Sequence, residues 1–183
     1  MESLNRGTVA ASMGDGRVFI SWRLLGTDPQ DTSFHVYRRG DDLSPVKVSD
    51  HPVIGATHLI DSPTADTSTI QYAVTPALSG SIPKSDEFVA VWVNGCLEIP
   101  IRPIENYRPG DASVGDLDGD GDLELVLHQV SNPRDNSHAG VTGSPVLEAY
   151  EFDGRFLWRI DLGPNIREGE HYTQFMVYDL DGD

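Results

Sequence analysis

Cysteine is nearly absent from this chain. Cys96 is the only one in 183 residues, so neither an internal disulfide nor a cysteine-type zinc site can form. Basic residues are also scarce, since 13 Lys and Arg stand against 29 Asp and Glu, for a net charge of −16. Because cations neutralise phosphate, this balance argues against nucleic acid and anionic membranes as partners. No apolar run is long enough for a membrane span, and residues 1–6 lack the features of a signal peptide.

A sustained helical pattern is missing too, whereas 18 glycines and 12 prolines suit a turn-rich β protein. From about Val9 to Ile101, apolar and polar residues alternate in short runs, which predicts about seven strands. The runs are 18–23, 34–38, 59–61, 70–74 and 88–93, with hairpin-type turns at Arg39–Asp42 and Asn94-Gly95. This spacing predicts a β-sandwich, and the pattern of its aromatic and apolar residues resembles fibronectin type III domains.

Prolines punctuate the stretch after this region, which predicts a stiff connector. We therefore expect a β-sandwich at 1–101, a linker at 102–110 and a second domain at 111–183. In the second domain, strand-like runs at 123–128, 146–152 and 156–160 precede another at 175–178. The motif Asp-Leu-Asp-Gly-Asp at Asp116–Asp120 recurs 63 residues later at Asp179–Asp183. About four strands per repeat predict the first blade of a β-propeller and the start of the next, within a longer protein.

Acidic residues concentrate in one loop, because the fourteen residues 111–124 hold six acids and no base. Alternating carboxylates with a glycine at the bend are typical of Ca²⁺ loops, and hard oxygen donors without His or Cys favour Ca²⁺. A helix–loop–helix site is excluded, because Leu127 occupies the position of its last ligand. We predict ligands from the Asp116, Asp118 and Asp120 side chains, the Asp122 carbonyl and Glu124. Asp179, Asp181 and Asp183 form a second, partial set that could not hold a metal tightly alone. A solvated acidic turn is the alternative.

The second half of the chain resembles rhamnogalacturonan lyases of polysaccharide lyase family 11. The resemblance rests on long runs of sequence, and residues 4–7 and 21–27 resemble the N-terminal β-domain of the same family. The runs in the second half are 111–121, 135–137, Leu157–Gly163 and His171–Asp183. This resemblance implies a β-sandwich followed by an eight-bladed propeller, and a monomeric protein that is extracellular or periplasmic. The residues alone leave a cytoplasmic location open.

The activity implied by the resemblance is cleavage of the rhamnogalacturonan I backbone of pectin by β-elimination at galacturonate. A base removes the C5 proton while a cation masks the carboxylate. We take Asp111, His128 and Asn136 as candidate substrate contacts and assign no catalytic base. We expect this chain alone to be inactive, because later blades would carry most of the cleft.

The sequence departs from the family pattern at two strand ends. Gly110 replaces an asparagine, and the run 128–131 replaces Lys-Trp-Asp-Pro. These two departures indicate either altered subsite recognition or a weakened lyase. The alternative is sequence drift at a peripheral subsite. A non-catalytic calcium-looped propeller module that binds carbohydrate or protein is the alternative function.

Overall fold

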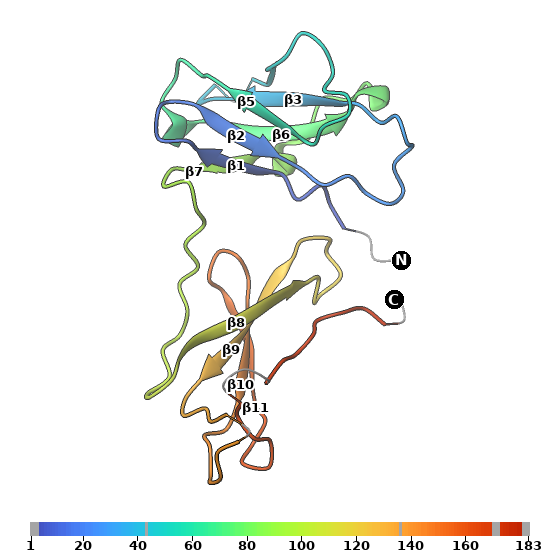
Figure 1. Ribbon diagram of the computed structural model, residues 1–183. Helices are drawn as coiled ribbons and strands as arrows, with labels where there is room; N and C mark the ends of the chain where they lie inside the picture. The colour runs from blue at the N-terminus through green and yellow to red at the C-terminus, as the bar shows by residue number, and fades with distance from the viewer. Residues whose placement is uncertain (1–3, 43, 136, 170–172, 181–183) are drawn as a thin grey trace. The chain divides into compact units, whose positions relative to one another are not determined.

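The computed structural model describes residues 4–42, 44–135, 137–169 and 173–180 of the chain. It is all-β, as predicted, and divides into two compact units at residues 4–97 and 98–183 (Figure 1). Each unit is built on its own sheet, so each is described by itself. β8 (Arg108–Gly115) begins within the span 102–110 that we expected to be a linker, and the predicted domain limits stay a prediction.

The first unit contains one continuous seven-stranded sheet. Its order is β4-β3-β6-β7-β1-β2-β5, and β7 joins the two halves by pairing antiparallel with β6 and parallel with β1. The strands are β1 (Val9–Ser12), β2 (Val18–Ser21), β3 (Phe34–Arg39), β4 (Val46–Lys47), β5 (His58–Asp61), β6 (Gln71–Pro76) and β7 (Val89–Trp92). Three short 3₁₀ helices lie between them, η1 (Thr67–Thr69), η2 (Ala77–Ser79) and η3 (Ser85–Glu87).

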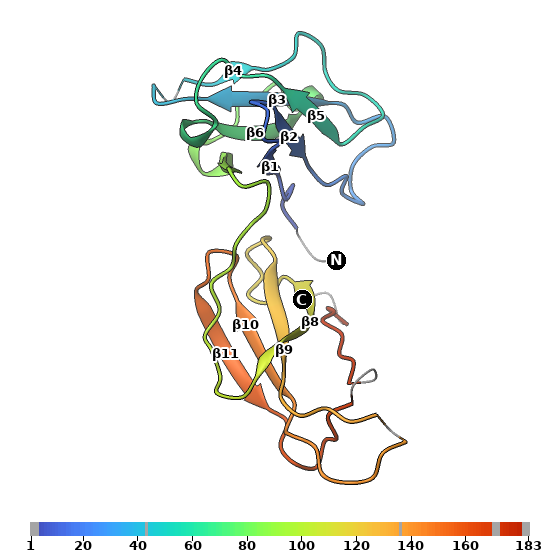
Figure 2. The same cartoon turned by 60° about the vertical axis from the view of Figure 1, so that its left-hand side comes forward.

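The two halves of this sheet share one hydrophobic core. Ile20 on β2, Val36 on β3 and Tyr72 on β6 are all fully buried within it. Alternation along the strands explains which of their side chains are buried, because every second residue of β2 and β3 points to the same face. Residues from distant strands can meet only if the sheet curls, and the ribbon shows this curling (Figures 1 and 2). The more specific fibronectin type III-like sandwich stays a prediction.

The second unit contains a four-stranded antiparallel meander. Its order is β11-β10-β9-β8, with β8 already given and the others being β9 (Glu124–Val130), β10 (Val146–Tyr150) and β11 (Phe156–Asp161). Figure 2 shows these strands side by side. β9 is paired on both edges and is the most buried of the four, so its polar residues lie inside the unit. The assignment of this sheet as a propeller blade stays a prediction.

Two local predictions were wrong. Asn94-Gly95 lies in a turn after β7, but no strand follows until Arg108, so it does not connect a hairpin. Residues 175–178 do not form a strand, although alternate side chains there remain exposed, such as Met176 and Tyr178. The alternating pattern was correctly identified, but a strand also needs a hydrogen-bonded neighbour, and none of the described strands pairs with this segment. By contrast, the predicted turn after Arg39 does connect antiparallel strands β3 and β4.

No helix in the described part of the chain has the length and apolar character that a membrane crossing requires.

Candidate metal centre

The acidic loop connects β8 to β9 and is held by its own carboxylates. Gly115 and Glu124 face each other across the strand pair, so the loop leaves and re-enters the sheet at one point. Asp116 Oδ1 accepts a hydrogen bond from the Gly119 N–H at 2.8 Å, and its Oδ2 accepts one from Gly121 at 3.0 Å. Both glycines have positive φ, 80° and 92°, which L side chains rarely adopt. The glycines therefore permit the bend that gathers the carboxylates.

Three carboxylates converge at this bend. One oxygen from each of Asp116, Asp118 and Asp120 lies within 4.8 Å of the others. Like charges at such separations repel one another, and a bound cation would relieve that repulsion. Asp120 Oδ1 also accepts the Asp122 N–H at 2.8 Å. Among the described residues, the carboxylates of Asp122 and Glu124 are not part of this group of three.

Glu124 lies at the start of β9 and is fully buried. Its Oε2 accepts the Leu117 N–H at 2.6 Å, whereas its Oε1 has no hydrogen-bond partner in the described structure. Burial raises the pKa of the Glu124 carboxyl, and the carboxylates of Glu151, Asp118 and Asp120 raise it further, while the bond from Leu117 opposes them. An unpartnered, buried carboxylate oxygen beside three converging acids fits a hard cation such as Ca²⁺.

The second acidic motif is only partly described. Asp179 is half-buried, whereas Asp181 and Asp183 lie outside the described residues. Val177, two residues earlier, lies against β8, because a Cβ added to Gly115 would be 2.5 Å from its Cγ1. The segment that leads into the second acidic motif therefore packs beside the start of the first acidic loop.

The predicted substrate contacts have different surroundings. Asp111 is exposed on β8, Asn136 lies outside the described residues, and His128 is only 3% exposed on β9. Burial lowers the pKa of the His128 imidazole, although the nearby carboxylates of Glu168 and Asp111 act in the opposite direction. His128 is buried within this unit, and its role as a substrate contact stays a prediction.

The two departures from the family pattern meet in space. A Cβ at Gly110 would overlap the Cγ2 methyl of Val130 and lie 3.1 Å from the His128 carbonyl oxygen. Asparagine therefore does not fit at position 110 while valine occupies position 130. The two positions are one packing unit, formed where β8 and β9 run side by side.

Sequence reasoning missed two buried carboxylates. Glu168 accepts hydrogen bonds from the Ser131 N–H at 2.7 Å, the Ser131 hydroxyl at 2.9 Å and the Asn132 N–H at 2.9 Å. His128 Nε2 lies 4.0 Å from it and has no hydrogen-bond partner among the described residues. No local pattern distinguishes Glu168, because its partners come from a segment more than thirty residues away.

Glu148 is the second missed carboxylate, and it is also fully buried. It accepts bonds from Gln129 Nε2 at 2.7 Å and the Tyr150 hydroxyl at 2.9 Å, and it pairs with Arg159 at 2.5 Å. Here a signal existed. An acid within an apolar strand, opposite an arginine across the turn at Asp153-Gly154, predicts an internal ion pair.

Both units match known family models. Residues 1–92 match the model described as "Rhamnogalacturonan I lyases beta-sheet domain", and residues 103–183 match "Rhamnogalacturonan lyase family 11, C-terminal domain". The first match alone covers half of the chain, and together they span nearly all of it. The protein belongs to the rhamnogalacturonan lyases, and within them to family 11.

Two curated relatives agree with this assignment. The chain is 45% identical over 195 residues to "Rhamnogalacturonan exolyase YesX" and 44% identical over 194 residues to "Rhamnogalacturonan endolyase YesW", both of Bacillus subtilis (strain 168). The alignments cover 100% of this chain but only 30% of each relative. No solved structure matches the chain.

Proposed function

We propose that this chain is part of a calcium-dependent lyase that cleaves the rhamnogalacturonan I backbone of pectin by β-elimination at galacturonate. The observation that carries the proposal is whole-chain similarity to two rhamnogalacturonan lyases, together with the acidic loop at Asp116–Glu124. An extracellular or periplasmic protein that acts as a monomer on a polymeric substrate fits this role.

In this proposal the second unit is the first blade of a propeller, and the first unit is a fibronectin type III-like sandwich. The consecutive meander β8 to β11 and the repeat of the acidic motif support a blade. The shared core of the two half-sheets supports a sandwich.

The acidic loop would hold Ca²⁺ through the Asp116, Asp118 and Asp120 side chains, the Asp122 carbonyl and Glu124. Bound Ca²⁺ would neutralise part of the net charge of −16, which would otherwise repel a polyanionic substrate. Asp116 binds the Gly119 and Gly121 N–H groups and thereby orients the loop. Glu124 links the loop to β9 through the Leu117 N–H. None of the described residues is proposed as the catalytic base, and Asp111 remains the exposed candidate for substrate contact.

A non-catalytic calcium-looped module that binds carbohydrate or protein is the second candidate. The packing of Gly110 against Val130 favours it, because the polar groups that the family pattern has at this strand end are replaced by a methyl contact.

The test is an elimination assay on the full-length gene product with rhamnogalacturonan I. The absorbance of the unsaturated uronate product should rise in calcium, stop after chelation and recover when calcium is restored. Polysaccharide binding without any new double bond in calcium would instead support the non-catalytic module.

A further inference from the structure

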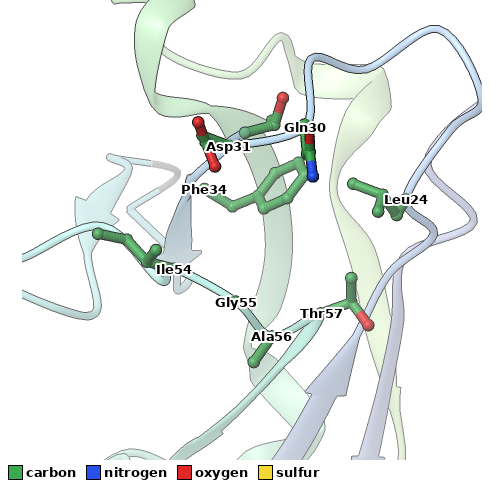
Figure 3. A pocket seen from close by; sticks show the side chains of 9 residues that line it. Leu24, Gln30, Asp31, Phe34, Ile54, Gly55, Ala56 and Thr57 are labelled. Carbon is green, nitrogen blue, oxygen red and sulfur yellow. The ribbon is translucent and has the colours of Figure 1, made fainter.

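A cavity of about 300 Å³ opens on the first unit, in the other half of the chain from the acidic loop. It is lined by three parts of the chain, one at Leu24, one at residues 30–32 and Phe34, and one at residues 54–57. Figure 3 shows Leu24, Gln30, Asp31 and Ile54 placed around the Phe34 ring. Its size lies at the lower end of the range for small-molecule sites, which matches a single sugar ring.

The floor of the cavity is a rigid part of the fold. Phe34 is 1% exposed and contacts the Trp22 ring edge-on, with centroids 5.4 Å apart. Its backbone exchanges two hydrogen bonds with Val53, at 3.0 and 2.8 Å. The floor of the cavity is therefore formed before any ligand arrives, which lowers the ordering cost of binding.

The charges around the cavity exclude an anionic ligand. No basic side chain lines it, whereas Asp31 does, and its carboxylate is exposed. The nearest basic group over the Phe34 ring is Arg6, at 5.2 Å, and it pairs with Asp28 at 2.5 Å. A uronate carboxylate would face Asp31 without a compensating cation, and like charges repel.

The remaining groups suit an uncharged sugar with an apolar substituent. The side chains of Gln30 and Asp31 form no hydrogen bonds with other described residues, so they can bind hydroxyl groups. Leu24 and Ile54 present apolar surface that is 58% and 75% exposed. A 6-deoxyhexose combines ring hydroxyls with a methyl group and thus matches both parts of the lining.

We propose that this cavity is a binding site for a neutral 6-deoxyhexose residue, with its methyl group against Leu24 and its hydroxyls on Gln30 and Asp31. The choice of rhamnose among such sugars rests on the proposed function, because rhamnose is the uncharged component of rhamnogalacturonan. The site would hold the polymer by its rhamnose residues, separately from elimination at galacturonate.

The test is a titration of the 183-residue chain with methyl rhamnoside, followed by ¹H–¹⁵N chemical shifts. The comparison ligand is the methyl glycoside of galacturonic acid with its C6 carboxylate ionised. Asp31→Ala removes the acceptor, and Asp41→Ala is the matched control, because Asp41 is an equally charged, exposed residue that does not line the cavity. Thermal melting of both variants checks that the fold is retained.

The expected result is saturable shifts at the amides of Thr32, Gly55 and Ala56 with the rhamnoside and none with the uronate. Asp31→Ala should weaken binding roughly tenfold, the scale for losing a hydrogen bond to a charged group, and Asp41→Ala should not change it. Absent or non-saturable shifts, equal shifts with the uronate, or equal loss in both variants would overturn the proposal. The readout is independent of lyase activity, so a failed elimination assay would leave this site standing as one for a neutral sugar.

Discussion

Glu124 and Leu117 form the contact that joins the acidic loop to the sheet. Oε2 of Glu124 accepts the Leu117 N–H at 2.6 Å, and Oε1 of the same carboxylate is buried without a hydrogen-bond partner in the part of the chain that the structure describes. Glu124 therefore uses one carboxylate oxygen to hold the loop at Leu117 and leaves the other oxygen for a further ligand. This division predicts that the effect of neutralising Glu124 depends on calcium.

Glu124→Gln keeps the shape of the side chain and removes its charge. In chelator the variant should be as stable as the wild type or about 1 kcal/mol more stable, because an unpaired buried charge is relieved. In calcium it should be less stable, because a ligand is lost. Urea unfolding in both buffers measures the two differences, with exposed Glu105→Gln as control. The same sign in both buffers would contradict a role in cation binding.

Glu148 should be essential to the second sheet. Glu148→Ala leaves Gln129, Tyr150 and Arg159 without their shared acceptor and should cost about 3–5 kcal/mol of the free energy of unfolding. Glu151→Ala is the matched control, because its partner Arg155 is 63% exposed and such a pair contributes about 0–1 kcal/mol. Denaturant curves of the two variants give the comparison, and similar losses would show that the buried network is not the stabilising element.

His128 should make stability depend on pH. Its pKa is lowered in the folded chain from the ordinary 6.5, so the unfolded chain binds more protons just below that value. Stability from this site is thus fully present above the unfolded pKa and falls as the pH drops below it. His35, whose pKa burial also lowers, contributes with the same sign in the first unit. Unfolding free energies measured through this pH window should vary less in His128→Gln than in the wild type. An unchanged slope would mean that His128 is not buried in its neutral form.

Gly110 and Val130 should behave as a coupled pair. Gly110→Asn alone should destabilise the chain by about 1–3 kcal/mol through overpacking, and adding Val130→Ala should recover much of that loss. A double-mutant cycle from urea unfolding gives the coupling energy. Additive effects would contradict the contact. Introduced into the full-length protein, the pair also tests whether this strand end controls substrate recognition.

The sequence predicted those features that depend on local pattern. Alternation located the strands around Val18, Phe34 and Tyr72, and the spacing of Asp116, Asp118 and Asp120 indicated the convergence of their carboxylates. Both rest on rules that relate neighbours along the chain, namely two-residue periodicity and the bend at glycine.

What could not be predicted depends on partners far apart in sequence. Phe175–Tyr178 alternates like a strand but pairs with none of the described strands, and the Asn94-Gly95 turn leads into a segment without a ladder. The buried Glu168 carboxylate is satisfied by N–H groups at Ser131 and Asn132, which only the folded chain brings to it. His128 is buried because β9 is paired with a strand on each edge. The sequence of β9 alone does not predict that pairing.

The most direct test of the account is the calcium dependence of melting of this chain. At a calcium concentration about a hundredfold above the dissociation constant, the wild type should gain roughly 2–3 kcal/mol, a rise in Tm of several degrees. Asp118→Ala should abolish that gain, and Asp111→Ala, an exposed residue of β8 outside the loop, should keep it. A calcium shift that persists in Asp118→Ala, or is absent from the wild type, would contradict the proposal that the acidic loop is a calcium site.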